Sequence, residues 1–293
     1  MRTYRKLWIA AAVVLVFAAL AVACAAELNR SAHSLTVTNY RIPTRKLDTP
    51  VRIVQLTDLH NSVFGEHNAE LVDTVNAQNP DLIVITGDLL DAGSADTDIA
   101  TDLIAQLSVI APVYVSLGNH ELEHEQTYGT DVTALYENAG AIVLDLSYAD
   151  ITVNEQSFRL GGIYGYCLPE QYLDTGEADE EECAFLRDFQ DTDLYTVLLC
   201  HMPACWIVND GINAWEIDCV FAGHAHGGQI RLPLIGGLWA PDQGWFPGQE
   251  AGLYYADDQQ KVMVLSRGLG STEKIPRFNN IPEVVTTECI PAE

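Results

Sequence analysis

Five short apolar segments constrain the fold of this chain more than any other feature of its sequence. Each is rich in β-branched residues, and helix-like stretches at 69–78 and 98–107 separate the early ones. This alternation predicts an α/β domain whose parallel strands are buried on both faces. The predicted strands are residues 51–56, 82–86, 113–117, 196–200 and 217–222.

Each of the five segments is followed by side chains that can bind a metal ion. Ligands of open α/β sheets bind beyond the carboxyl ends of the strands, so these polar clusters should converge on one crevice. Five of the eight histidines fall in the clusters, whereas His67 and His124 are expected at the surface. In order, the clusters hold Asp58 and His60, Asp88 and Asp91, Asn119 with His120 and Glu121, His201, and His224 with His226.

The types of side chain in these clusters narrow the chemistry. Asp, His and Asn without Cys suit divalent metals of intermediate hardness, such as Mn, Fe and Zn. The clusters hold too many potential ligands for one tetrahedral ion, but they suit two ions that share a bridging carboxylate. Two ions about 3.5–4 Å apart are the usual arrangement for in-line displacement at phosphorus. The sequence therefore predicts a binuclear metal centre that acts on phosphate esters.

The ordered motifs carry a resemblance to a known family. Asp-x-His, Gly-Asp-x-x-Asp, Gly-Asn-His-Glu, His and Gly-His-x-His resemble the signature of the calcineurin-like metallophosphoesterases over about residues 51–285. The Gly227-Gly228-Gln229 extension and the tail from Ser266 to Glu283 are similar to the membrane-associated bacterial branch. That branch includes a bacillus-type phosphoesterase and UDP-2,3-diacylglucosamine hydrolases. Thr57 departs from the pattern, because Ser is frequent at its position.

The resemblance implies a fold and a division of the ligands between two ions. The fold is a four-layer α/β sandwich of two mixed β-sheets flanked by helices. The apolar run of residues 7–26 separately predicts one N-terminal transmembrane helix before it. Asp88 would bridge the two ions. By position, Asp58, His60 and His226 would hold one ion, and Asn119, His201 and His224 the other.

The resemblance also implies roles for residues that do not bind metal. His120 would be the catalytic residue, and Asp91 and Glu121 would fix the orientation of the ligands. Arg267 could contact a substrate phosphate, with an ordinary ion pair as its alternative role. The implied reaction is attack of metal-activated hydroxide on a phosphodiester, a phosphomonoester or a pyrophosphate.

Two alternatives stay open beside a general phosphoesterase. One is hydrolysis of a UDP-2,3-diacylglucosamine-type pyrophosphate. The other is a non-catalytic metal-binding module for protein interaction, which the presence of both His120 and Asp88 disfavours. Hydrolysis of amides or lactams is disfavoured because the His-x-His-x-Asp-His run is absent.

The balance of charge limits the partners. The chain has 41 acidic and 15 basic residues, which gives a formal net charge of −26. Such a surface repels polyanions, so nucleic acid binding is not expected. A phosphorylated small molecule or a lipid-linked substrate is compatible, because bound metal ions reverse the local charge.

The N-terminus predicts a membrane anchor. Residues 7–26 carry no charge, and a membrane-spanning helix needs about 20 such residues. Cleavage near Ala23 or lipidation of Cys24 are the alternatives. We expect an anchor at 1–26, a polar tether with an edge strand (34–40) at 27–50, and a catalytic domain at 51–293. Isolated cysteines such as Cys200 and Cys219 lie in apolar runs and are expected to be buried.

The three basic residues before the apolar segment generate a test of topology. Arg2, Arg5 and Lys6 favour retention of the N-terminus in the cytoplasm, which places the catalytic domain outside. A C-terminal alkaline phosphatase fusion should therefore be active in intact cells, and a C-terminal green fluorescent protein fusion should be dark. The reverse pattern would contradict the predicted orientation.

Overall fold

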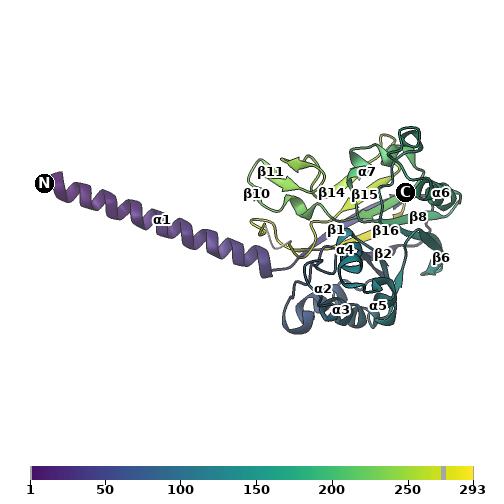
Figure 1. Cartoon of the computed structure of the whole chain (residues 1–293), viewed down its shortest axis with the longest axis horizontal. Coiled ribbons are helices and arrows are strands. Elements are labelled where there is room, and N and C mark those ends of the chain that lie inside the picture. Colours follow the sequence, from purple (N-terminus) through teal and green to yellow (C-terminus); the bar gives the residue numbers. More distant parts are fainter. Residues whose placement is uncertain (1, 272–274, 293) are drawn as a thin grey trace.

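The computed structural model describes residues 2–271 and 275–292. A long helix, α1 (Arg2–His33), projects from a body that contains all the other elements (Figure 1). The body has two six-stranded sheets.

The first sheet has the order β1-β16-β2-β3-β4-β5. Strands β2 to β5 are parallel to one another, and β16 runs antiparallel to β2. The C-terminal strand β16 therefore lies between β2 and β1, with which it pairs in parallel over nine positions. The bounds are β1 (Thr36–Thr44), β2 (Val51–Leu56), β3 (Leu82–Thr86), β4 (Val113–Ser116), β5 (Ala141–Val143) and β16 (Glu283–Pro291).

The second sheet has the order β14-β15-β9-β8-β7-β6. Its four central strands are parallel, and antiparallel strands close both edges. Both sheets are thus mixed, as the resemblance implied. The bounds are β6 (Ser147–Val153), β7 (Gln156–Ile163), β8 (Tyr195–Cys200), β9 (Cys219–Ala222), β14 (Gly252–Tyr255) and β15 (Val262–Leu265).

Three apolar clusters stack these elements into four layers. Ile53 and Val84 of the first sheet pack against Val197 and Phe221 of the second, in the cluster between the sheets. A second cluster joins the outer face of the first sheet to its helices, and a third joins the second sheet to α6, α7 and α8. The predicted four-layer sandwich is confirmed. The helices are α2 (Ala69–Asn76), α3 (Asp98–Ser108), α4 (Asn119–Tyr128) and α5 (Val132–Asn138) on one side, and α6 (Glu180–Gln190), α7 (Ala204–Ile207) and α8 (Gly211–Ala214) on the other.

The observed strands agree with the predicted ones to within two residues at each end. Strands β2 and β3 coincide with the predictions, whereas β9 begins at Cys219 rather than at residue 217. The five strands divide between the sheets: β2, β3 and β4 lie in the first, and β8 and β9 in the second. The polar clusters therefore approach one another from two sheets.

The N-terminal region differs from the expected tether. Helix α1 continues past residue 26 to His33, and it is long and apolar enough to cross a bilayer. Its last turn is fixed to the body, because the buried Ser31 hydroxyl accepts a hydrogen bond from the N–H of Asn280 (3.3 Å). Strand β1 does lie at a sheet edge, but it extends to Thr44.

The burial of the cysteines and of two histidines can also be compared with the predictions. The six cysteines that follow α1 are buried and unbridged, which confirms the expectation for Cys200 and Cys219. His67 is exposed as expected, but the prediction for His124 is wrong: α4 turns its side chain into the body. No pattern of neighbouring residues marked that burial.

Candidate metal centre

The loops after the strands place the predicted ligands through unusual backbone conformations. Asp58, His60, Asp88, His224 and His226 all have φ between 46° and 66°. Residues other than glycine seldom adopt this left-handed region, and such strain tends to gather at functional sites. Backbone bonds also join the loops that follow β2 and β3: the N–H of Asp58 donates to Gly87 O, and the N–H of His60 to Asp88 O (both 3.0 Å).

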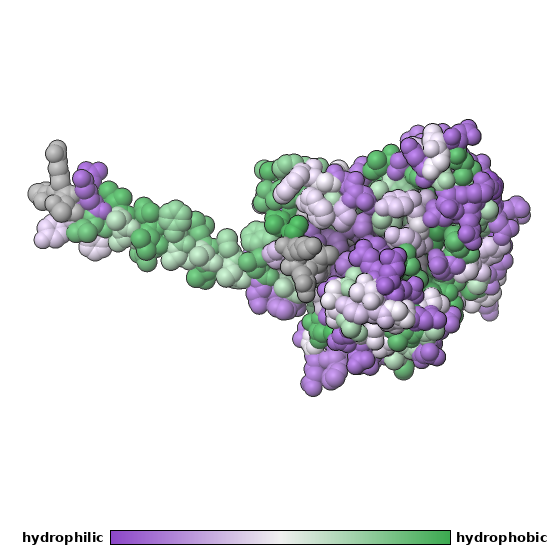
Figure 2. Space-filling model, in the orientation of Figure 1, coloured by the Kyte–Doolittle hydropathy of each residue, from purple (hydrophilic) through white to green (hydrophobic). Residues whose placement is uncertain are grey.

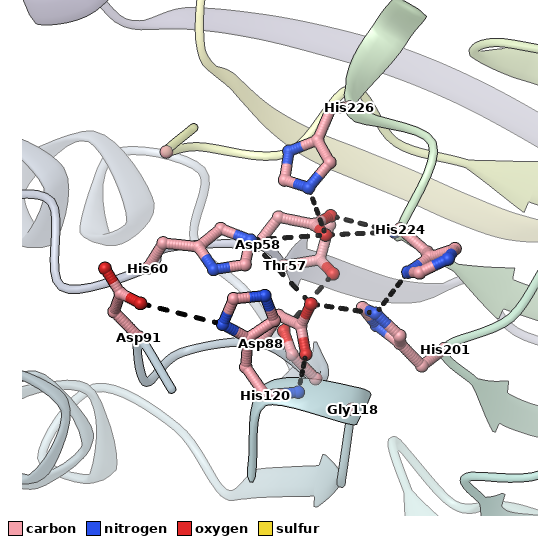
Figure 3. Close-up of polar contacts among 12 residues, drawn as sticks. Thr57, Asp58, His60, Asp88, Asp91, Gly118, His120, His201, His224 and His226 are labelled. Carbon is pink, nitrogen blue, oxygen red and sulfur yellow. Dashed lines mark hydrogen bonds and ion pairs between the residues drawn. The ribbon is translucent and has the colours of Figure 1, made fainter. Parts of the chain in front are cut away.

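One group of potential ligands consists of Asp58, His60 and His226 (Figure 3). Their ligand atoms all lie within 4.8 Å of one another. Nε2 of His226 is 3.5 Å from Asp58 Oδ1, and Nε2 of His60 is 4.0 Å from the same oxygen. All three side chains are buried. The structure thus brings together the three residues that the resemblance assigned to one ion.

A second group consists of Asp88, His201 and His224. Nε2 of His201 lies 3.1 Å from Asp88 Oδ2 and 3.2 Å from Nδ1 of His224. The same Asp88 oxygen is 3.7 Å from Nε2 of His60, in the first group. Asp88 therefore lies between the two groups, which is the position that a bridging carboxylate requires.

The polar atoms that line these groups fit divalent cations. Both ring nitrogens of His60, Nδ1 of His226 and Oδ1 of Asn119 are buried without a hydrogen-bond partner among the described residues. A buried polar atom left without a partner costs about 1–3 kcal/mol. Imidazole nitrogens, carboxylates and an amide oxygen are ligands that Mn, Fe and Zn accept. Coordination of metal ions would satisfy these atoms.

The electrostatics of the site agree with that interpretation. Burial lowers the pKa of His60 to about 3 and also holds the pKa of His226 well below its usual value, so both rings are neutral, as metal ligands must be. Burial opposes a charge on His201 too, but the neighbouring Asp88 raises the pKa of His201 to about 10. The space between His201 and Asp88 therefore favours a positive charge, which a metal ion can supply in place of the proton.

Glu121 fixes the loop that carries Asp88. Its buried carboxylate accepts backbone N–H bonds from Asp88 (2.7 Å), Leu89 (2.8 Å) and Leu90 (3.1 Å). It also accepts the N–H of Gly118 (2.8 Å) and the hydroxyl of Tyr136 (2.9 Å). Glu121 thus acts on the backbone of the loops after β3 and β4 rather than on a ligand side chain.

His120 lies at the edge of the site, with its side chain 16% exposed. Its backbone N–H donates to Asp88 Oδ1 (2.9 Å), and its ring packs edge-on against the His60 ring. Nδ1 accepts a hydrogen bond from the N–H of Ala92 (3.0 Å), so the proton of the neutral ring lies on Nε2. Asp91 Oδ1 lies 3.8 Å from His120 Nδ1, and the Asp91 charge also acts to raise the pKa of the predicted ligand His60, against the larger effect of burial.

Arg267 takes the alternative role that the sequence left open. Its guanidinium donates to Glu283 Oε1, and its backbone N–H donates to the other oxygen of the same carboxylate (both 2.9 Å). This ion pair fixes the segment after β15 to the start of β16. The structure therefore gives Arg267 a partner within the protein.

Comparison with known proteins identifies the family. Residues 51–228 match the family described as calcineurin-like phosphoesterase, and this match covers more than half of the chain. The chain belongs to that family. It is similar to phosphodiesterase YaeI of Escherichia coli K12, at 28% identity over 82% of this chain and 83% of the relative. It is also similar to the protein YpbG of Bacillus subtilis, at 24% identity over 98% of this chain and 99% of the relative.

Other relatives of this calcineurin-like phosphoesterase are longer. A metallophosphoesterase of Campylobacter jejuni is 28% identical over 70% of this chain. The chain spans about half of that relative, 52% of its length. The family match, together with the similarity to YaeI and to the Campylobacter protein, confirms the resemblance drawn from the ordered motifs.

Three further residues reach the site of this phosphoesterase without a signal in the sequence. Asp242 Oδ2 lies 3.2 Å from Nε2 of His224, on the side of the ring away from His201. Asn280 Nδ2 donates to the carbonyl of His226 (2.7 Å). The buried Arg277 donates to the carbonyls of Gly270 and Arg267, and its Nη1 has no partner among the described residues. All three follow His226 in irregular segments, which local patterns do not place.

The five bonds of Glu121 generate a testable prediction. In Glu121→Gln, an NH₂ group replaces one of the two accepting oxygens and faces N–H donors. We expect the free energy of unfolding to fall by about 1–3 kcal/mol and the manganese content to fall with it, because the Asp88 loop loses its support. Thermal denaturation and metal analysis measure both effects.

Tyr136→Phe is the matched control, since it removes only the hydroxyl donor to the same carboxylate. Its effect on stability should be smaller, about 1 kcal/mol, and its metal content should stay that of the wild type. A Glu121→Gln protein with unchanged stability and metal content would contradict the role given to the carboxylate.

Proposed function

We propose that this protein hydrolyses phosphate esters with two divalent metal ions, Mn, Fe or Zn. The observation that supports this most directly is the position of Asp88, within 3.1 Å of His201 and 3.7 Å of His60. Two buried sets of ligands share this one carboxylate. The residues that would hold the ions are Asp58, His60, His226, Asp88, Asn119, His201 and His224.

The bound ions would supply Lewis acidity toward the phosphate oxygens and generate a nucleophile from water. The protein contributes the positions of the ligands. His201 is oriented by its Nδ1, which lies 2.6 Å from the Thr86 carbonyl and leaves Nε2 for coordination. Asp242 orients His224 in the same way from its outer nitrogen, the arrangement in which a carboxylate fixes a metal-binding histidine.

His120 is the group that we propose to act on the leaving oxygen. Its Nδ1 is engaged by Ala92, so Nε2 carries the proton that an acid catalyst would donate. Its side chain is 16% exposed, whereas those of His60 and His201 are fully buried. His120 is therefore on the side from which a substrate can approach.

We further propose that α1 anchors the enzyme in the cytoplasmic membrane, with the catalytic domain outside. Its exposed apolar residues and the basic residues before them support this orientation. The substrate would be a phosphorylated small molecule or a lipid-linked phosphate ester. A phosphodiester is the first class to test, because one relative of similar length is named a phosphodiesterase.

The metal pair is tested by Asp88→Asn. Purified wild type should contain close to two divalent ions per chain and should cleave bis-p-nitrophenyl phosphate with added manganese. Asp88→Asn should lose both ions and the activity, because one carboxylate serves both groups of ligands.

Asp102→Asn on the exposed face of α3 is the matched control, and it should keep the metal content and rate of the wild type. Active wild type with one ion per chain, or unchanged occupancy in Asp88→Asn, would contradict the two-metal proposal.

His120→Asn separates catalysis from ligation. We expect normal metal content and a catalytic rate lower by about 10² or more, because the variant loses the proton donor. The loss should be larger for an alkyl ester than for a p-nitrophenyl ester, whose leaving group needs no proton.

Asn119→Ala provides the comparison, because Asn119 is a proposed ligand with a buried, unpartnered oxygen. Its activity should fall through lower metal affinity and should recover in part with excess manganese. If His120→Asn loses its metal and recovers in the same way, then His120 is a ligand and not the acid catalyst.

A further inference from the structure

The segment of residues 232–249 has a composition unlike the rest of this acidic protein. Asp242 is its only charged residue, although the chain as a whole is 19% charged. Four of its large apolar side chains are exposed: Leu234 fully, Ile235 to 60%, Trp245 to 71% and Phe246 to 63%. Soluble surfaces rarely gather such side chains unless they meet a partner or a membrane.

The segment folds into two short hairpins, and these side chains lie within the hairpins or directly after them. Strands β10 (Arg231–Leu232) and β11 (Gly236–Gly237) form the first hairpin, with Leu234 and Ile235 in its turn. Strands β12 (Trp239–Ala240) and β13 (Gly244–Trp245) form the second, which Phe246 follows. The surface over β10 and β11 is green, and thus apolar, in Figure 2.

Hydrogen bonds fix the segment to the metal centre. The N–H of Leu238 donates to the carbonyls of Gly228 (3.1 Å) and Ile230 (2.8 Å), directly after the ligand His226. Asp242 reaches His224 from the second hairpin. The apolar turns therefore keep a defined position relative to the ligands.

The same segment lies beside the root of α1. Asn279 Nδ2 donates to the carbonyl of Arg231 in β10 (3.0 Å), and the next residue, Asn280, donates its N–H to Ser31 at the end of α1. The hairpins thus lie on the side of the body from which α1 leaves (Figure 1). An anchor that crosses a bilayer would hold this side against the bilayer surface.

We propose that residues 232–249 form an interfacial loop that lies in the surface of the bilayer anchoring α1. Trp and other amphipathic or apolar side chains favour the boundary between head groups and acyl chains. The near absence of charge lets the segment approach a membrane that the acidic remainder of the body would avoid. This arrangement turns the His224 and Asp242 side of the metal centre toward the lipid head groups.

A consequence, which rests on the proposed phosphoesterase function, is that the enzyme prefers phosphate esters held in the membrane. The hairpins would present head groups to the metal centre, since Asp242 in the second hairpin contacts a proposed ligand directly. A soluble ester would reach the same ligands without that presentation.

Fluorescence of the full-length protein in phosphatidylcholine vesicles tests the contact, independently of activity. Trp8→Phe first removes the tryptophan of α1. With lipids brominated on the acyl chains, the remaining fluorescence should be quenched, and Trp239→Phe with Trp245→Phe should remove most of that quenching. Leu234→Gln with Ile235→Gln should reduce the quenching of Trp245, whereas Val109→Gln, an 86% exposed residue after α3, should not.

The same quenching with and without these two tryptophans, or no quenching, would overturn the proposal. The proposal would also be overturned if Leu234→Gln with Ile235→Gln changed the oligomeric state in detergent but left the quenching unchanged. The segment would then bind a second copy of the chain.

Activity measurements test whether the hairpins present lipid head groups to the metal centre. The rate on phosphatidyl-p-nitrophenol in vesicles, divided by the rate on soluble bis-p-nitrophenyl phosphate, should fall about tenfold in Leu234→Gln with Ile235→Gln and stay constant in Val109→Gln. If the ratio of the vesicle rate to the soluble rate stays constant in both variants, the proposal that the hairpins present head groups is wrong. Wild type that cleaves neither ester with manganese would refute the phosphoesterase proposal, while the quenching result would still decide the membrane contact.

Discussion

The arrangement of the other site residues depends on the buried carboxylate of Asp88 and its interactions with the histidines around it. This carboxylate faces His60, which follows a strand of the first sheet, and His201, which follows a strand of the second sheet. It therefore links the two sheets electrostatically. A carboxylate buried this deeply needs compensating charge or hydrogen bonds. The backbone N–H of His120 supplies one bond, and the proposed ions would supply the charge.

The backbone around Asp88 is arranged to place that carboxylate. A Cβ atom on Gly118 would lie 2.2 Å from Asp88 Oδ1, so only glycine permits this approach of the loop after β4. Asp88 itself has a positive φ of 56°, and Glu121 stabilises this conformation through bonds to three consecutive N–H groups. Strain at Asp88 is thus offset by hydrogen bonds to Glu121, which lies in the first turn of α4.

The strands and ligands could be predicted from the sequence because each is a local pattern. Residues 82–85 of β3 are all apolar, and Asp88 lies two residues after the last residue of the strand, Thr86. The role of residues such as Asp242 and Arg277 could not be predicted, because their positions depend on how irregular segments pack. The extension of α1 to His33 was missed because the prediction followed the apolar run, which ends before Glu27. Glu27, Leu28 and Arg30 are good helix formers that can continue the helix, and the contact of Ser31 with Asn280 is tertiary.

The buried Arg277 places a positive charge close to the ligands of this acidic protein. Burial lowers the pKa of Arg277 to about 10, which still leaves the guanidinium charged near neutral pH. Its charge also contributes to the low pKa of His226, after burial and His60, and thereby favours the neutral ring that a metal ion needs. Positive charge at this site is therefore local and fixed, so a net charge of −26 over the whole chain does not set the potential that a phosphate would meet at the metal centre.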